Sequence, residues 1–204
     1  MVVIPAGEAV LLKAETGVIP EAKISRMWRA AFFLLVSLLV SCGPKPIEGL
    51  KTFAYAGGQQ QEGKIAYAQT PPVGGAYSPL WQRCGAYTAP LYDEYAVHSL
   101  ERGAVWVTYS PALPAAEVAK LRALLAQPRA GKDDQKTAQK TVMPSLLSPY
   151  AGLPTPVVVS VWNAQVQLSG PDDPRLAAFL EQFSKDRKAP EAGKGCAEGY
   201  TGTQ

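Results

Sequence analysis

The only histidine of the 204-residue chain, His98, stands in the sequence HSLERG, three positions before Glu101 and four before Arg102. An imidazole changes its charge near neutral pH, so it can act as a general acid or base or bind a metal ion. If the stretch forms a helical turn, His98 and Glu101 share a face and can form a hydrogen bond. The structural alternative is that this pair caps and orients the segment leading into a strand, with Gly103 supplying backbone freedom. We favour the structural role.

Nucleophilic catalysis has little support in the sequence. Ser78 and Ser99 are the available hydroxyls near His98, and neither lies in the spacing of a nucleophile elbow. We therefore assign no catalytic residue and lean against an enzyme. A hydrolase that uses His98 and Glu101 ranks last among the functions considered.

Aromatic residues surround this histidine in the sequence: Tyr77, Trp81, Tyr87, Tyr92 and Tyr95. These rings could line a ligand groove, but packing of an ordered loop is the more common use of such residues. We interpret residues 80–96 as such a loop, and Asp93-Glu94 within it as a solvated turn.

The elements that must position these residues indicate an α+β domain. The run 103–109 (GAVWVTY) is rich in β-branched and aromatic residues and predicts a strand. The run 157–168, apolar in its first half and alternating in its second, predicts a second, long strand. Shorter strands are predicted at 50–55 and at 64–68. An apolar stripe with three- and four-residue spacing predicts a helix that opens at 113–117 and ends at Pro128.

A second helix is predicted to begin at Asp172-Asp173-Pro174, with Leu176, Phe179, Leu180 and Phe183 on one side. A charged, exposed turn is expected at 130–140. The fold class is therefore α+β, with a small, mostly antiparallel sheet, two packing helices and long ordered loops.

The sequence from Met27 to Cys42, MWRAAFFLLVSLLVSC, has the features of an export signal. Arg29 precedes an apolar run that is too short to span a bilayer but suits a signal peptide. Its end resembles the bacterial lipobox, which implies cleavage before Cys42 and lipidation of that cysteine. Two alternatives are a disulfide role for Cys42 after an ordinary signal-peptide cut, and a buried helix.

The leader sets the expected organisation of the chain. Residues 1–26 do not fit a signal peptide, so we expect translation to begin at Met27, a cytoplasmic extension being less favoured. Residues 27–41 are then the lipoprotein signal peptide, and residues 42–64 form a tether and first strand. The domain follows at 65–196, and residues 197–204 are expected to be a flexible tail.

Export also bears on the two remaining cysteines, Cys84 and Cys196. In an oxidising compartment an isolated pair usually forms a disulfide, which here would tie the C-terminal end to the middle of the domain. A metal or redox role for this pair is the less favoured alternative. The formal net charge of +3 comes from scattered Lys and Arg residues, so the sequence indicates no nucleic-acid partner.

Several segments together resemble one family, the bacterial domain of unknown function DUF3105. They are TPPVGGAYSP (70–79), CGAYTAPLYDEYAVHSLERGAVWVTY (84–109), the PAAEVAKLRAL helix, PVVVSVWNAQVQL (156–168) and KAPEAGKGC (188–196), and they cover roughly residues 65–196. The family is commonly exported or membrane-anchored, and the resemblance implies no particular reaction.

The resemblance also implies how this chain departs from its relatives. The family pattern places histidines where this chain has Tyr77 and Arg102, so only His98 remains. Three histidines with Glu101 could bind zinc or copper in relatives, whereas one imidazole and one carboxylate are too few for a tight site. We therefore assign no metal ligand and no cofactor, and take Tyr77, His98, Glu101 and Arg102 as the candidate site.

These observations predict a lipoprotein anchored to the bacterial membrane through Cys42, with its domain outside the cytoplasm, in the periplasm or at the cell surface. Its predicted function is non-enzymatic binding or interaction within the envelope, with a protein or small-molecule partner that the sequence does not identify. The alternative is weak metal binding by a degenerate copper or zinc site in the His98 region.

Overall fold

The structure is a computed structural model that describes residues 46–130, 140–185 and 188–204. These residues belong to one compact unit, which spans residues 44–204. The expected leader, Cys42 and most of the charged turn at 130–140 lie outside the described residues. Within them, no helix is long and apolar enough to cross a membrane.

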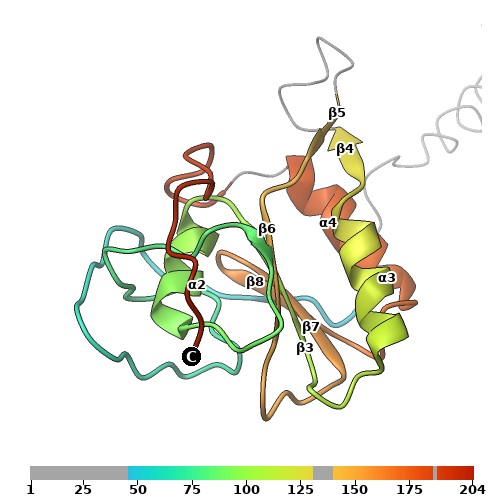
Figure 1. The fold of residues 1–204 in the computed structure, drawn as a ribbon. Helices are drawn as coiled ribbons and strands as arrows, with labels where there is room; N and C mark the ends of the chain where they lie inside the picture. The colour runs from blue at the N-terminus through green and yellow to red at the C-terminus, as the bar shows by residue number, and fades with distance from the viewer. Residues whose placement is uncertain (1–45, 131–139, 186–187) are drawn as a thin grey trace, which may run out of the picture. The chain divides into compact units, whose positions relative to one another are not determined.

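A six-stranded mixed sheet forms the centre of the domain (Figure 1). From one edge to the other, its strands are β1 (Lys51–Thr52), β8 (Ala164–Leu168), β7 (Val157–Val161), β3 (Val105–Tyr109), β6 (Ser145–Pro149) and β2 (Gly85–Ala86). The pairs β1–β8, β8–β7 and β7–β3 are antiparallel, whereas β3–β6 and β6–β2 are parallel. A separate hairpin pairs β4 (Pro128–Ala130) with β5 (Lys140–Val142).

Strand β3 lies within the sheet, and its side chains point alternately into two hydrophobic cores, one on each face of the sheet. Val105, Val107 and Tyr109 join the cluster on one face, whereas Trp106 joins the cluster on the other. This is the two-residue period of a strand whose two faces are both covered. All five residues of β3 are buried, so the helices that cover the sheet must lie on both sides of it.

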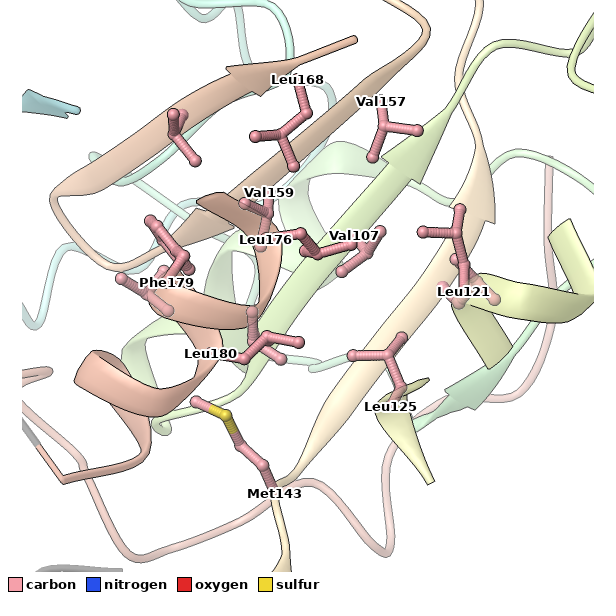
Figure 2. Packing of buried hydrophobic residues seen from close by; sticks show 14 of the residues in the cluster. Val107, Leu121, Leu125, Met143, Val157, Val159, Leu168, Leu176, Phe179 and Leu180 are labelled. Atoms are coloured by element: carbon pink, nitrogen blue, oxygen red, sulfur yellow. The ribbon is translucent and has the colours of Figure 1, made fainter. Parts of the chain in front are cut away.

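Helices α3 (Ala115–Leu125) and α4 (Pro174–Lys185) cover the first face. Figure 2 shows Leu121 and Leu125 of α3 pointing at the sheet, and Leu176, Phe179 and Leu180 of α4 doing the same beside Val107 and Val159. Each such buried side chain contributes roughly 1.5–3 kcal/mol. Asp173 begins α4 by accepting a hydrogen bond from the backbone N–H of Arg175, and Pro174 follows at the first helical position.

Helix α2 (Asp93–Glu101) covers the opposite face (Figure 1). The α+β prediction and the α3 and α4 predictions are therefore confirmed, but α2 is a third helix where the sequence predicts a loop. The residues of α2 are buried on nearly every side, so no single apolar stripe marks the helix.

Two strand predictions need correction. The long strand expected at 157–168 is a hairpin of β7 and β8, because Asn163 takes a left-handed conformation (φ 64°) that turns the chain back. Asparagine tolerates this conformation better than other non-glycine residues do, so a turn forms without a glycine. The short strand expected at 64–68 is not formed, and Ile65 instead donates its backbone N–H to Glu94.

Candidate functional site

Helix α2 carries His98, Glu101 and, at its C-cap, Arg102. The helix is stopped by Gly103, whose φ of 91° is in the left-handed region. The backbone N–H of Gly103 donates to the carbonyl of Leu100, and that of Ala104 donates to the carbonyl of Ser99. This pair of hydrogen bonds is a Schellman motif, which satisfies the last carbonyls of the helix and sends the chain directly into β3. The role predicted for Gly103 is confirmed.

His98 lies in an aromatic enclosure and is only 3% exposed. The Tyr77 ring lies 4.4 Å from the imidazole, centroid to centroid, and the Trp81 ring meets it edge-on at 5.5 Å. The carbonyl oxygen of Ser78 lies 2.8 Å from Nδ1 of His98. On the other side of the ring, Nε2 lies 3.9 Å from Oε2 of Glu191.

These contacts favour one neutral form of the imidazole. Burial lowers the pKa of His98 below its ordinary value of 6.5, although the Ser78 carbonyl and the Glu191 carboxylate act in the opposite direction. A carbonyl can only accept, so a neutral His98 carries its hydrogen on Nδ1 and donates it to Ser78. Nε2 then holds the lone pair, 3.9 Å from a carboxylate oxygen of the partly exposed Glu191.

Glu101 is fully buried and shares its environment with Tyr77. Oε1 of Glu101 accepts a 2.7 Å hydrogen bond from the backbone N–H of Gly58, while Oε2 has no hydrogen-bond partner among the described residues. Burial, followed by the Glu101 carboxylate, raises the pKa of the Tyr77 phenol above its usual value. The N-terminal loop approaches closely here, because a Cβ at Gly57 would overlap both Oε1 of Glu101 and the ring of Pro190.

Arg102 binds the C-terminal segment, which we define as residues 188–204. Its Nε donates to the carbonyl of Gly195 at 2.6 Å, and its Nη2 donates to that of Lys194 at 3.2 Å. Nη1 lies 3.5 Å from Oε2 of Glu191, and the guanidinium lies over the Trp81 ring. The backbone of Glu191 also donates to the carbonyl of Glu101. The end of α2 is thus attached to the C-terminal segment at several points.

The C-terminal segment runs past α2 and is held along its length (Figure 1). Cys84 and Cys196 form a disulfide, as predicted, with Cα atoms 5.2 Å apart. Beyond it, the backbone N–H of Arg83 donates to Tyr200, and the side chain of Gln204 donates to Leu91. The structure thus fixes residues 197–204 by hydrogen bonds, whereas composition alone predicts a flexible tail.

The acidic pair Asp93-Glu94 is not a solvated turn. Glu94 is buried and accepts the backbone N–H of Ile65 at 2.8 Å. Asp93 accepts the hydroxyl of Tyr150 at 2.9 Å, and its other oxygen is buried without a partner among the described residues. Burial raises the pKa of Asp93 to about 6 in spite of the Tyr150 hydrogen bond. Both carboxylates therefore hold the first turn of α2 against neighbouring segments.

The structure brings the four candidate residues together around one end of α2, and it adds partners that sequence reasoning missed. Glu191, Lys194 and Gly195 complete the surroundings of His98 and Arg102, and Ser78, considered in the sequence for its hydroxyl, contributes its carbonyl. The Cys84–Cys196 pair was the one sequence signal for them, since it predicts that the segment near Cys196 lies beside the middle of the chain. Tyr92, Tyr95 and Tyr200 form a separate ring cluster.

The donor set offers little for a metal ion. Among the described residues, no three His, Cys, Asp or Glu side chains form a group that could hold a metal ion. His98 and Glu191 form only a pair, with 3.9 Å between the nearest atoms.

The comparisons with known proteins give one match. The model of a family described as "Protein of unknown function (DUF3105)" matches residues 59–198, which is more than half of the chain. This range contains the segments that carry the resemblance in the sequence. No curated protein and no solved structure matches the chain.

Proposed function

Because the chain belongs to the DUF3105 family, whose description names no activity, we propose its function from the site and the sequence together. We propose that this is an extracytoplasmic lipoprotein, anchored through Cys42, whose domain is a non-enzymatic binding or envelope-interaction module. In this proposal the residues around His98 are a structural brace for the C-terminal segment rather than a reacting centre.

The observation that carries the proposal is how His98 and its neighbours are used. Nδ1 faces the Ser78 carbonyl, Nε2 faces Glu191, and aromatic rings cover the imidazole. A general base needs access to the proton it removes, within about 3 Å or through one water. Here the imidazole is 3% exposed and is enclosed by the Ser78 carbonyl, two aromatic rings and Glu191, which supports a structural role.

The disulfide supports the extracytoplasmic part of the proposal. The bridge joins residues 112 positions apart and fastens the segment that Arg102 also binds. Disulfides persist in oxidising compartments and are rare in the reducing cytoplasm. The bond is therefore consistent with a chain that the leader at 27–41 exports.

Mass spectrometry of the full chain purified from membranes tests the anchoring. The expected product begins at Cys42, carries acyl chains on that residue, and contains the bridged Cys84 and Cys196. A Cys42→Ser variant should lose the acyl chains. An intact leader with an unmodified thiol at Cys42 would contradict the proposal.

Weak metal binding is the second candidate function, favoured by the approach of Glu191 to Nε2 of His98. It predicts stoichiometric zinc or copper in protein purified without chelator, lost in His98→Ala. His98→Asn is the matched control for folding, since an amide N–H can replace the hydrogen bond to Ser78. Metal content that is negligible and unchanged in both variants would exclude this candidate and leave the structural role.

A further inference from the structure

A wide hollow in the described domain has a lining that includes none of the residues around His98. It is a groove of about 830 Å³ between α3 and the ends of β3 and β6, within the size range of small-molecule sites. We call it the α3 groove. Its walls include Pro90, Tyr109, Pro111, Val118, Ala119 and Pro149.

One positive charge stands in this apolar groove. Arg122 lines it, and among the residues that the structure describes no hydrogen bond or ion pair engages its guanidinium. The positive charge of Arg122 acts to lower the pKa of the Tyr109 phenol. Burial raises that pKa by more, so the net shift is upward. Tyr109 in turn donates to the carbonyl of Tyr87, the residue before the groove-lining Thr88. The guanidinium of Arg122 and the hydroxyl of Tyr109 thus lie near each other in the groove.

The walls exclude one class of occupant. Prolines supply no backbone N–H, and beyond its first turn the backbone of α3 is engaged within its own helix. An extended peptide would leave its N–H and carbonyl groups without partners along such walls, which is costly. A hydrocarbon chain has no such groups to satisfy, and a single anionic head would meet the free guanidinium of Arg122.

We infer that the α3 groove binds a single-chain amphiphile with an anionic head, such as a fatty acid, with its carboxylate at Arg122 and its chain along Val118 and Ala119. This inference rests on the proposed binding role of the domain, though not on its anchoring. In this inference the α3 groove, and not the residues around His98, is the binding surface of the domain.

Photocrosslinking of the full chain in its own membranes tests the inference. A dodecanoate probe with a diazirine in its chain should label residues 103–129, with competition by dodecanoate about tenfold stronger than by dodecanol and weakest by dodecylamine. In Arg122→Gln the preference for dodecanoate over dodecanol should disappear. Arg83→Gln, which changes an exposed arginine outside the groove, should keep it.

A second pair of variants tests the groove itself. Ala119→Leu fills it and should abolish labelling, whereas Ala116→Leu, on the same helix but outside the groove, should not. Unchanged melting temperatures show that both variants fold. Equal competition by all three amphiphiles, or competition by an acidic peptide but not by dodecanoate, would overturn the inference. Anchoring is read separately from the mass of the Cys42 peptide, so failure of one proposal is distinguishable from failure of the other.

Discussion

The guanidinium of Arg102 lies 4.0 Å from the centroid of the Trp81 ring, while its nitrogens donate to the carbonyls of Gly195 and Lys194. Stacking and forked hydrogen bonding at once are possible only for a planar cation. This one side chain therefore connects the loop before α2, the end of α2 and the C-terminal segment.

Replacement of Arg102 by lysine should show that geometry, rather than charge, matters here. Arg102→Lys keeps the positive charge but loses the planar fork and the stacking, so we expect a loss of about 1–3 kcal/mol in the free energy of unfolding. Urea unfolding measures this loss, and faster amide exchange at residues 194–196 should accompany it. Arg83→Lys is the control, since Arg83 is exposed. Equal stability of both variants would contradict the role given to Arg102.

The close approach of Gly57 to Glu101 makes a second prediction. A methyl group at Gly57 would overlap Oε1 of Glu101 and the ring of Pro190, so Gly57→Ala should destabilise the domain by roughly 1–3 kcal/mol. Gly170→Ala is a matched control, because open space surrounds Gly170 and its backbone is not left-handed. Thermal unfolding of the two variants checks this difference. If Gly57→Ala melts no lower than Gly170→Ala, the packing described around Glu101 is wrong.

The sequence predicts some of these elements and not others. Helices α3 and α4 each pack one apolar side on the sheet, and β3 is a β-branched and aromatic run, so the sequence predicts all three. Helix α2 is enclosed on almost all sides and begins at Tyr92 without a side-chain cap, so neither its period nor its start is visible. The hairpin turn at Asn163 is also hidden, because residues 157–168 read as one strand and contain no glycine or proline.

The candidate site shows a similar division. Tyr77, His98, Glu101 and Arg102 are indicated by motif and are close together in the structure. Their partners Glu191 and Gly195 lie about ninety positions away in the sequence, at separations of 89 and 93 residues from Arg102. Contacts over such distances are set by the path of the whole chain, and only the cysteine pair indicates them in advance.

Asp93 predicts a pH dependence of stability. Its pKa is raised from 3.8 to about 6, so the folded chain keeps a proton there that the unfolded chain has already lost. The free energy of unfolding should therefore fall as the pH rises from about 4 to about 6. Asp93→Asn stays neutral and should be more stable than the wild type above pH 6, by at most about 3 kcal/mol.

Urea unfolding of both proteins between pH 4 and pH 8 measures this effect, with Glu62→Gln as a control at an exposed carboxylate. The advantage of Asp93→Asn should shrink toward zero near pH 4. An advantage that does not change with pH would mean that Asp93 is not the group responsible.

NMR titration of the imidazole shows whether His98 is a buried structural residue, and its signals are unambiguous because the chain has no other histidine. Burial lowers the pKa of His98 below 6.5, so protonation is opposed by folding and stability should fall as the pH drops below 6.5. We expect a titration midpoint below 6.5, with the Nδ1–H form present above it. A midpoint at or above 6.5, or the Nε2–H form at neutral pH, would contradict this structural role.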